Sequence, residues 1–256
     1  MRSHHLLILG GTTEARLLAQ KLAMRFGVTV TLSLAGRTEQ PLHQAVPVRS
    51  GGFGGAEGLA HWLREKGVDL LIDATHPFAS RISANAQSAA MATGIGLITL
   101  RRPQWVQQPG DRWHEVDSVA AAVPLLGDKR TRVFLAIGRQ EAHMFEAAPQ
   151  HDYLVRSVDP VVPPLALPHV RTVLARGPFA LEDEIALLQQ HHIDCIVAKN
   201  SGGSATYGKI EAARQLGIKV IMVARKGITG GKVAGTVDEA LALIDHVFFP
   251  DKWGSI

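Results

Sequence analysis

The sequence is poor in cysteine and in long apolar runs. Its 256 residues include one cysteine, Cys195, which excludes an internal disulfide and a cysteine-based metal cluster. Cys195 stands in an apolar strand-like run, where we expect a small buried side chain. No apolar run approaches the roughly 18 residues that a membrane helix needs, and the N-terminus shows no signal-peptide pattern. We therefore expect a cytoplasmic protein with no membrane partner.

Several catalytic motifs are also missing. There is no Tyr-x-x-x-Lys pair, because Tyr153 is followed four residues later by Ser157 and Tyr207 by Glu211. The sequence also lacks a G-x-S-x-G elbow, a nucleotide P-loop and a His-Glu-x-x-His zinc motif. The net charge is only +4, and the arginines and lysines are scattered rather than clustered. We therefore expect no metal site and no nucleic-acid partner.

The remaining composition is that of an ordinary soluble protein, with 46% hydrophobic and 20% charged residues. Strand-like apolar runs alternate with helical segments, which predicts an α/β protein with Rossmann-like, doubly wound parallel sheets. The predicted strands are 5–9, 28–33, 69–74, 96–100, 133–137, 153–156, 172–175, 193–198 and 219–223. The predicted helices are 13–26, 56–66, 80–93, 117–126, 181–191, 205–216 and 237–246.

The chain also repeats itself at long range. The matching segments are 6–18 with 133–145, 67–101 with 192–225, and 113–126 with 233–244. Repeated α/β segments this far apart predict two domains of one type, and ligands commonly bind in the cleft between two domains. A polar, turn-rich stretch at 127–131 marks the boundary. We predict a first domain over 1–128, a second over 129–256, and a ligand cleft between them.

A glycine-rich turn follows the first strand. Gly10, Gly11, Thr12, Thr13 and Glu14 lead directly into a helix. Glycines let the backbone approach a ligand closely, a threonine can cap the helix, and the exposed N–H groups favour a pyrophosphate. The third glycine of the usual dinucleotide-binding motif is absent, so a plain tight turn without a ligand is the alternative.

The end of the second strand indicates which nicotinamide cofactor would fit. An acidic residue there typically holds the ribose of NAD, whereas basic and hydroxyl groups hold the 2′-phosphate of NADP. Ser33 and Arg37 precede the first acid, Glu39, which favours NADPH. The alternative is that Arg37 is an ordinary surface charge. The glycines around Phe53, Gly52 among them, allow contact with a flat part of the cofactor, or simply a flexible helix entry.

Two further polar loops follow buried strands, where open α/β sheets bind ligands. They are Thr75-His76-Pro77-Phe78 and Lys199-Asn200-Ser201-Gly202-Gly203. The histidine could deliver a proton or serve only the helix entry. Arginines close several strands, at Arg101, Arg102, Arg139, Arg156 and Arg176. If they converge, they suit a substrate with several carboxylates, and otherwise each is a solvated charge.

Taken together, eight stretches make the chain resemble the precorrin-6A reductases of cobalamin biosynthesis. They are ILGGTTEA, AGRT, GGFGG, IDATHPFA, RPQW, VFLAIGRQ, ARGPF and VAKNSGG, spread over residues 8–203. The resemblance implies an NADPH-dependent oxidoreductase that converts precorrin-6A to precorrin-6B, with hydride added to C19 and a proton to C18. A tetrapyrrole with many carboxylates accounts for the dispersed arginines, and its conjugated imine system needs no Tyr/Lys pair. Transient contact with neighbouring pathway enzymes is compatible with this role.

These observations lead to a hypothesis for each site residue. For the cofactor they are Gly10, Gly11, Thr12, Thr13, Glu14, Ser33, Arg37, Gly52, Phe53 and Thr75. For the substrate they are Pro77, Phe78, Arg101, Arg139, Asn200, Ser201, Gly202 and Gly203. His76 and Lys199 are the candidates for proton delivery, with solvent an equal alternative. Two other functions stay open, a reductase of the cobalt-containing intermediate and a non-catalytic NADP(H) sensor.

Overall fold

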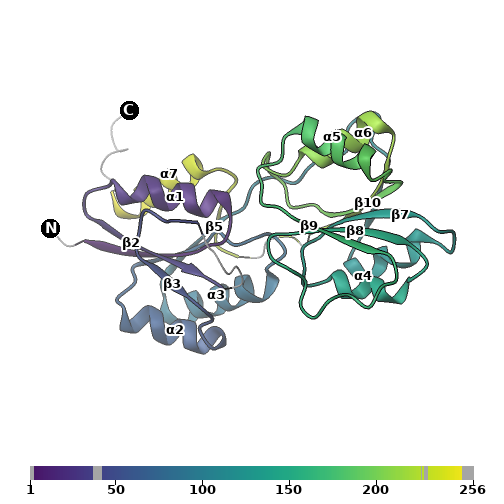
Figure 1. Cartoon of the computed structure of the whole chain (residues 1–256). Helices are drawn as coiled ribbons and strands as arrows, with labels where there is room; N and C mark the ends of the chain where they lie inside the picture. The colour runs from purple at the N-terminus through teal and green to yellow at the C-terminus, as the bar shows by residue number, and fades with distance from the viewer. Residues whose placement is uncertain (1–2, 37–41, 226, 228–229, 250–256) are drawn as a thin grey trace. The chain divides into compact units, whose positions relative to one another are not determined.

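The computed structural model describes residues 3–36, 42–225, 227 and 230–249. These residues form two compact units, each built on one six-stranded sheet (Figure 1). Every recorded strand pair in both sheets is parallel. The predicted α/β class with two Rossmann-like sheets is confirmed. None of the helices in the described ranges has the length and apolar character needed to cross a membrane.

Unit 1 has helices on both faces of its sheet. Its strands in spatial order are β12 (Lys232–Ala234), β5 (Gly96–Leu100), β4 (Leu70–Asp73), β1 (His4–Leu9), β2 (Val28–Leu34) and β3 (Val48–Ser50). Helices α1 (Thr13–Ala23) and α7 (Val237–Phe248) cover one face, and α2 (Gly55–Glu65) and α3 (Ser80–Thr93) cover the other (Figure 1). Alternation along β1 explains this, because Leu6 and Ile8 pack with α1 and α7, whereas Leu7 and Leu9 pack with α2 and α3.

Unit 2 repeats the same strand order. Its strands in spatial order are β6 (Trp113–Val116), β11 (Lys219–Val223), β10 (Cys195–Lys199), β7 (Arg132–Ala136), β8 (Asp152–Ser157) and β9 (Val170–Leu174). Helices α5 (Leu181–Gln190) and α6 (Gly208–Leu216) cover one face, over a core that includes Phe134, Ile196 and Met222. The short α4 (Val119–Ala122) lies on the opposite face (Figure 1). Two 3-10 helices complete the unit, η1 (Pro124–Leu126) and η2 (Ala142–Ala147).

The division of the chain differs from the predicted boundary at 127–131. Unit 1 comprises Met1–Pro103 and Gly227–Ile256, and unit 2 comprises Gln104–Lys226. Relative to the predicted domains, one edge strand of each sheet is exchanged. β6 was expected in the first domain but pairs with β11 of unit 2, and β12 was expected in the second domain but pairs with β5 of unit 1. The repeat correctly matched these two strand–helix segments to each other. It could not tell which sheet each one joins, because backbone pairing between strands depends little on side-chain identity.

The predicted strands and most predicted helices are present. The exceptions are short elements. The segment 117–126 forms only α4 followed by η1, and the edge strands β3, β6 and β12 escaped a prediction based on apolar runs. Each of these edge strands has three or four residues, most of them not buried.

Candidate active site

The turn after β1 brings the backbone close to the neighbouring strand. The Gly10 N–H donates to the Ser33 carbonyl at 2.9 Å. A Cβ atom at Gly10 would lie 2.6 Å from Leu32 Cδ1, so no other residue fits without a shift. Gly11 has a φ of +112°, a conformation that favours glycine. The turn therefore favours glycine at position 11 through its backbone conformation, and a side chain at position 10 would have to displace the end of Leu32.

Thr12 fixes the start of α1. Its Oγ1 accepts from the Ala15 N–H at 3.1 Å and donates to the Ala74 carbonyl at 2.8 Å, at the end of β4. This hydroxyl is therefore used within the protein, as the helix cap and as a tie to β4. The helix behind it has 11 residues, so the N–H groups of its first turn form a ready anion site. A close glycine turn followed by a capped helix fits the pyrophosphate of a dinucleotide.

Glu14 lies in the first turn of α1, where a carboxylate would repel a phosphate. Its charge is offset by Arg102, whose Nη1 donates to the Glu14 Oε2. The Glu14 side chain is 23% exposed and that of Arg102 is 15% exposed, so solvent screens the attraction between the two charges only in part. The turn therefore presents no uncompensated negative charge to an anionic ligand.

The ends of β2 and β3 meet at an arginine that the sequence analysis missed. Arg49 is paired in register with Ser33, and its Nη1 donates to the Ser33 hydroxyl at 2.8 Å. It also donates to the carbonyls of Gly51 and Gly52, and its guanidinium lies 3.8 Å from the centre of the Phe53 ring. The predicted Ser33, Gly52 and Phe53 are thus joined in one cluster. Its sequence signal was an arginine directly before the glycine-rich stretch.

Arg37, which we predicted at this corner, lies outside the described residues. The prediction for Arg37 therefore stays a prediction. Ser33, which was predicted to bind the same phosphate, is 6% exposed, and its hydroxyl accepts from Arg49.

A buried network lies at the end of β4. Asp73 accepts from the N–H and the hydroxyl of Thr75, at 3.1 and 2.6 Å. The Arg101 Nη2 lies 3.6 Å from Asp73 and donates to the Ser83 hydroxyl at 3.1 Å. Thr75 and Arg101 were predicted to contact cofactor and substrate. Both are instead engaged mainly with protein groups, and the Arg101 side chain is only 7% exposed.

His76, Pro77 and Phe78 lie in the turn before α3, where His76 is exposed, Phe78 is half-buried and Pro77 is buried. The Nδ1 atom of His76 accepts from the Phe78 N–H at 3.3 Å, and the two rings are 5.9 Å apart. An imidazole that accepts at Nδ1 carries its proton on Nε2 when it is neutral. His76 is exposed, so a ligand can approach the ring.

Several of these predicted residues line a common small pocket in unit 1. Its lining comprises Thr12, Glu14, Thr75, Pro77, Leu100, Arg101 and Arg102. They come from the loops after β1, β4 and β5, so the carboxyl edge of the sheet gathers them as parallel pairing requires. The pocket adjoins the glycine turn through Thr12.

The corresponding edge of unit 2 is built from ion pairs. Lys199 at the end of β10 is paired with Glu141, and Arg139 lies 3.8 Å from Asp159 and donates to the Pro160 carbonyl. The Lys199 ammonium is therefore engaged by a protein carboxylate. Arg156, another arginine at a strand end, is buried and bidentate on Glu184.

Asn200 has a different role from the one predicted. Its side chain is 2% exposed, accepts from the Trp105 N–H at 2.9 Å and donates to the Trp105 carbonyl at 3.0 Å. The Trp105 indole donates to the Gly203 carbonyl at 2.7 Å. The loop that contains Ser201 and Gly202 therefore holds Trp105 in place, and Asn200 cannot reach a substrate without breaking these bonds.

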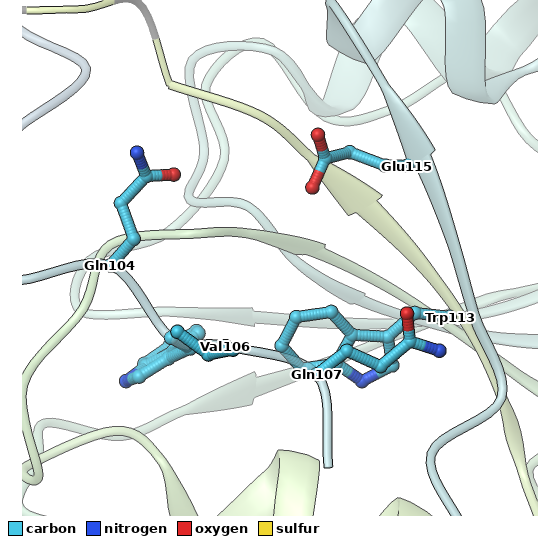
Figure 2. Close-up of a pocket in the computed structure, with 6 residues that line it drawn as sticks. Gln104, Val106, Gln107, Trp113 and Glu115 are labelled. Carbon is cyan, nitrogen blue, oxygen red and sulfur yellow. The ribbon is translucent and has the colours of Figure 1, made fainter. Parts of the chain in front are cut away.

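A second pocket, of about 330 Å³, lies in unit 2 and was not predicted. It is lined by Gln104, Trp105, Val106, Gln107, Trp113 and Glu115. Figure 2 shows the Gln104 and Glu115 side chains on one side, and Val106 and the Trp113 ring on the other. The lining has one acid and no cation, so its charge does not suit a polycarboxylate.

Other reactive groups are unsuited to catalysis. Burial raises the pKa of the Cys195 thiol to about 11 and that of Tyr153 further above its ordinary value. The Tyr153 hydroxyl is committed to the Ala148 carbonyl at 2.8 Å. Among the described residues no cluster of His, Cys, Asp and Glu could hold a metal ion.

The comparison with known proteins decides the family. The sequence model of the precorrin-6x reductases CbiJ/CobK matches residues 5–245. The chain belongs to this family. It is accordingly an oxidoreductase of cobalamin biosynthesis, as the motifs indicated. A reductase with Rossmann-like sheets indicates a nicotinamide cofactor.

Similar proteins support this assignment over nearly the whole chain. A precorrin-6A reductase from a Sinorhizobium species is 61% identical, over 98% of this chain and 96% of the relative. A cobalt-precorrin-6A reductase from Priestia megaterium is 30% identical, over 94% and 98%. A solved structure described as CobK precorrin-6A reductase is 47% identical and superimposes with a TM-score of 0.91, over 95% of this chain and 97% of that one.

Proposed function

We propose that this reductase uses NADPH to convert metal-free precorrin-6A to precorrin-6B, with hydride delivered to C19 and a proton to C18. The observation that carries the cofactor half of the proposal is the glycine turn with its capped helix at the carboxyl edge of unit 1. The substrate half is supported by identity: the precorrin-6A reductase noted above is 61% identical, and the cobalt-precorrin-6A reductase is 30% identical.

NADPH, when bound, supplies the hydride, and the chain's own residues orient it. Gly10 and Gly11 let the backbone lie against the pyrophosphate, and Thr13 and Glu14 offer the first N–H groups of α1. Thr12 keeps that helix end in position through its bond to Ala74. Orientation of this kind is a large part of catalysis when the acceptor is already an activated imine system.

His76 is the proton donor in this proposal. To deliver a proton, His76 would first be protonated on Nδ1, which releases the bond from the Phe78 N–H; the imidazolium would then donate from Nε2 and be left as a neutral ring. Pro77 and Phe78 would contact the macrocycle from the same turn. Lys199 is paired with Glu141, so we assign it with Arg139, Ser201, Gly202 and Gly203 to contacts with substrate carboxylates. Asn200 and Arg101 position other residues.

The test is anaerobic NADPH oxidation with metal-free precorrin-6A, followed by absorbance, with NADH and the cobalt-containing substrate in parallel. Turnover with NADPH and the metal-free substrate, and little with the other combinations, is the expected result. Turnover restricted to the cobalt-containing substrate would overturn the metal-free assignment. Tight NADPH binding with no turnover on either substrate would favour a sensor.

The His76 assignment is tested by His76→Gln, which retains a hydrogen-bonding side chain without a titrating proton. We expect kcat to fall by about 10²-fold or more with little change in KM for NADPH. His61→Gln, at an exposed histidine of α2, serves as the control. An unchanged kcat for His76→Gln would leave solvent as the donor.

A further inference from the structure

Arg49 has the position and the bonding of a built anion site. It lies on β3 directly opposite Ser33 of β2, and its guanidinium donates to the Ser33 hydroxyl and to the carbonyls of Gly51 and Gly52. The Phe53 ring covers one face of the group at 3.8 Å. A side chain held at four points is pre-organised, so a ligand that binds it loses little further conformational entropy.

Among the described residues, Arg49 has no carboxylate partner. All three of its acceptors are neutral, and among the described residues no carboxylate lies within ion-pair distance of it. Burial lowers its pKa, yet a guanidinium remains charged at any physiological pH. A partly buried charge without a counter-charge is unfavourable, and an anionic ligand would remove that cost.

Donors remain for such a ligand. An arginine has five N–H groups. The bonds to Ser33 and Gly51 use both of those on Nη1, and the bond to Gly52 uses one on Nη2. The Nε–H and the second N–H on Nη2 bond no acceptor among the described residues. Two adjacent N–H groups on a planar guanidinium match two oxygens of a phosphate.

The cluster is also adjacent to the glycine turn. The Ser33 carbonyl accepts from the Gly10 N–H, so the residue whose hydroxyl holds Arg49 is bonded through its backbone to the turn. In this strand order a dinucleotide lies across the carboxyl edge, with its adenosine ribose over the end of β2. A group beside Ser33 on β3 is therefore next to the 2′ position.

We propose that Arg49 is the residue that recognises the 2′-phosphate of the cofactor and so selects NADPH over NADH. This rests on the proposed function. It moves the main determinant of specificity from Arg37, where the sequence suggested it, to an arginine on the neighbouring edge strand. Ser33 acts through Arg49 by holding it, and Phe53 stacks on the guanidinium.

The test compares three variants of the full chain, Arg49→Met, Arg49→Lys and Arg37→Met. Arg64→Met is the matched control, because Arg64 also bonds a main-chain carbonyl in unit 1, that of Ala92. Dissociation constants are measured for NADPH and NADH by calorimetry, with 2′-AMP and 5′-AMP as fragment probes. A merely structural role would weaken NADPH and NADH equally.

We expect Arg49→Met to weaken NADPH and 2′-AMP at least tenfold and NADH and 5′-AMP less than threefold. Arg49→Lys should retain part of the preference for NADPH over NADH, because it keeps the charge but cannot bond Ser33, Gly51 and Gly52 together. If Arg49→Met does not fold, the loss of preference in Arg49→Lys tests the proposal. If the wild type prefers NADPH and Arg49→Met keeps that preference, only the Arg49 assignment fails. If the wild type shows no preference, the proposed cofactor fails with it.

Discussion

The two units share one strand order but differ in the segment that comes after their first strand. In unit 1, β1 leads through two glycines into an 11-residue helix capped by Thr12. In unit 2, β7 leads through Gly138 and Arg139 into the six-residue η2, which has no side-chain cap. A helix end can attract an anion only where a regular helix stands behind it. The comparison therefore supports our proposal that dinucleotide recognition lies in unit 1.

The units also differ in the polar groups at the carboxyl edges of their sheets. Both edges contain ion pairs, but unit 1 also offers backbone N–H groups and Arg49, which has no carboxylate partner among the described residues. The cations at the edge of unit 2 are paired, Lys199 with Glu141 and Arg139 with Asp159. Each of these pairs places one cation at the edge, with the Lys199 side chain 13% and the Arg139 side chain 31% exposed. We infer that such a surface suits a ligand with several movable carboxylates better than one rigid pyrophosphate.

The largest expected effect comes from the buried ion pairs, one in each unit. Arg156–Glu184 and Arg101–Asp73 are equally buried, with side chains 7% and 3% exposed in both. Only the first is bidentate, and it is stacked by Phe179 at 3.7 Å. Glu184→Gln leaves a buried guanidinium unpaired and should cost about 3–5 kcal/mol of unfolding free energy.

Asp73→Asn is the matched variant in unit 1. It should cost less, because Arg101 lies 3.6 Å from Asp73 and an amide oxygen can still accept from Thr75. Urea unfolding combined with hydrogen exchange in β8 and β4 assigns each loss to its unit. Equal losses for the two variants would contradict the view that the units hold their arginines differently.

The next effect separates helix capping from nucleotide binding. Thr12→Ala removes the cap of α1, and Ser118→Ala removes the equivalent cap of α4, where Ser118 accepts from the Ala121 N–H at 3.1 Å. Each should cost about 1 kcal/mol of stability. Only Thr12→Ala should also weaken NADPH, by roughly five- to tenfold. Calorimetric titration of both variants measures this, and an equal loss of affinity would show that the effect is not local.

Much of the fold was predictable because parallel strands that are buried on both faces consist of continuous apolar residues, which are visible in the sequence. Residues 70–73 and 219–223 are examples, and both form interior strands of their sheets. The exchange of β6 and β12 was not predictable. Those strands are short and lie at sheet edges, and they join their sheets through backbone bonds that carry no signal in the side chains.

Only those parts of the candidate site that lie in a single loop after a strand were predictable from the sequence. The glycine turn and the loop at 75–78 were predicted because they follow buried strands, where open α/β sheets bind ligands. Asn200 was misread because its partner, Trp105, lies 95 residues away in the chain. Arg49 was missed for a similar reason, since its value depends on Ser33 across the sheet. Such pairs follow from strand order and not from local pattern.

The smallest expected effect is a pH dependence confined to unit 2. His151 directly precedes β8, where unit 1 has Gly27 before β2, and its side chain is fully buried. Burial lowers the pKa of His151, while Asp128 and Asp152 raise it to a lesser extent. The folded state therefore binds the proton less readily than the unfolded state does.

His151 thus contributes stability above its unfolded pKa of about 6.5 that is lost as the pH falls toward the lower folded value. Urea midpoints measured from pH 7.5 to 5 should decline in the wild type and decline less in His151→Leu. Gln150→Leu, at the neighbouring non-titrating residue, should shift every midpoint by a similar amount. A wild-type slope retained in His151→Leu would assign the acid sensitivity to other groups. Because Gly27 cannot titrate, hydrogen exchange at pH 5 should show unit 2 opening before unit 1.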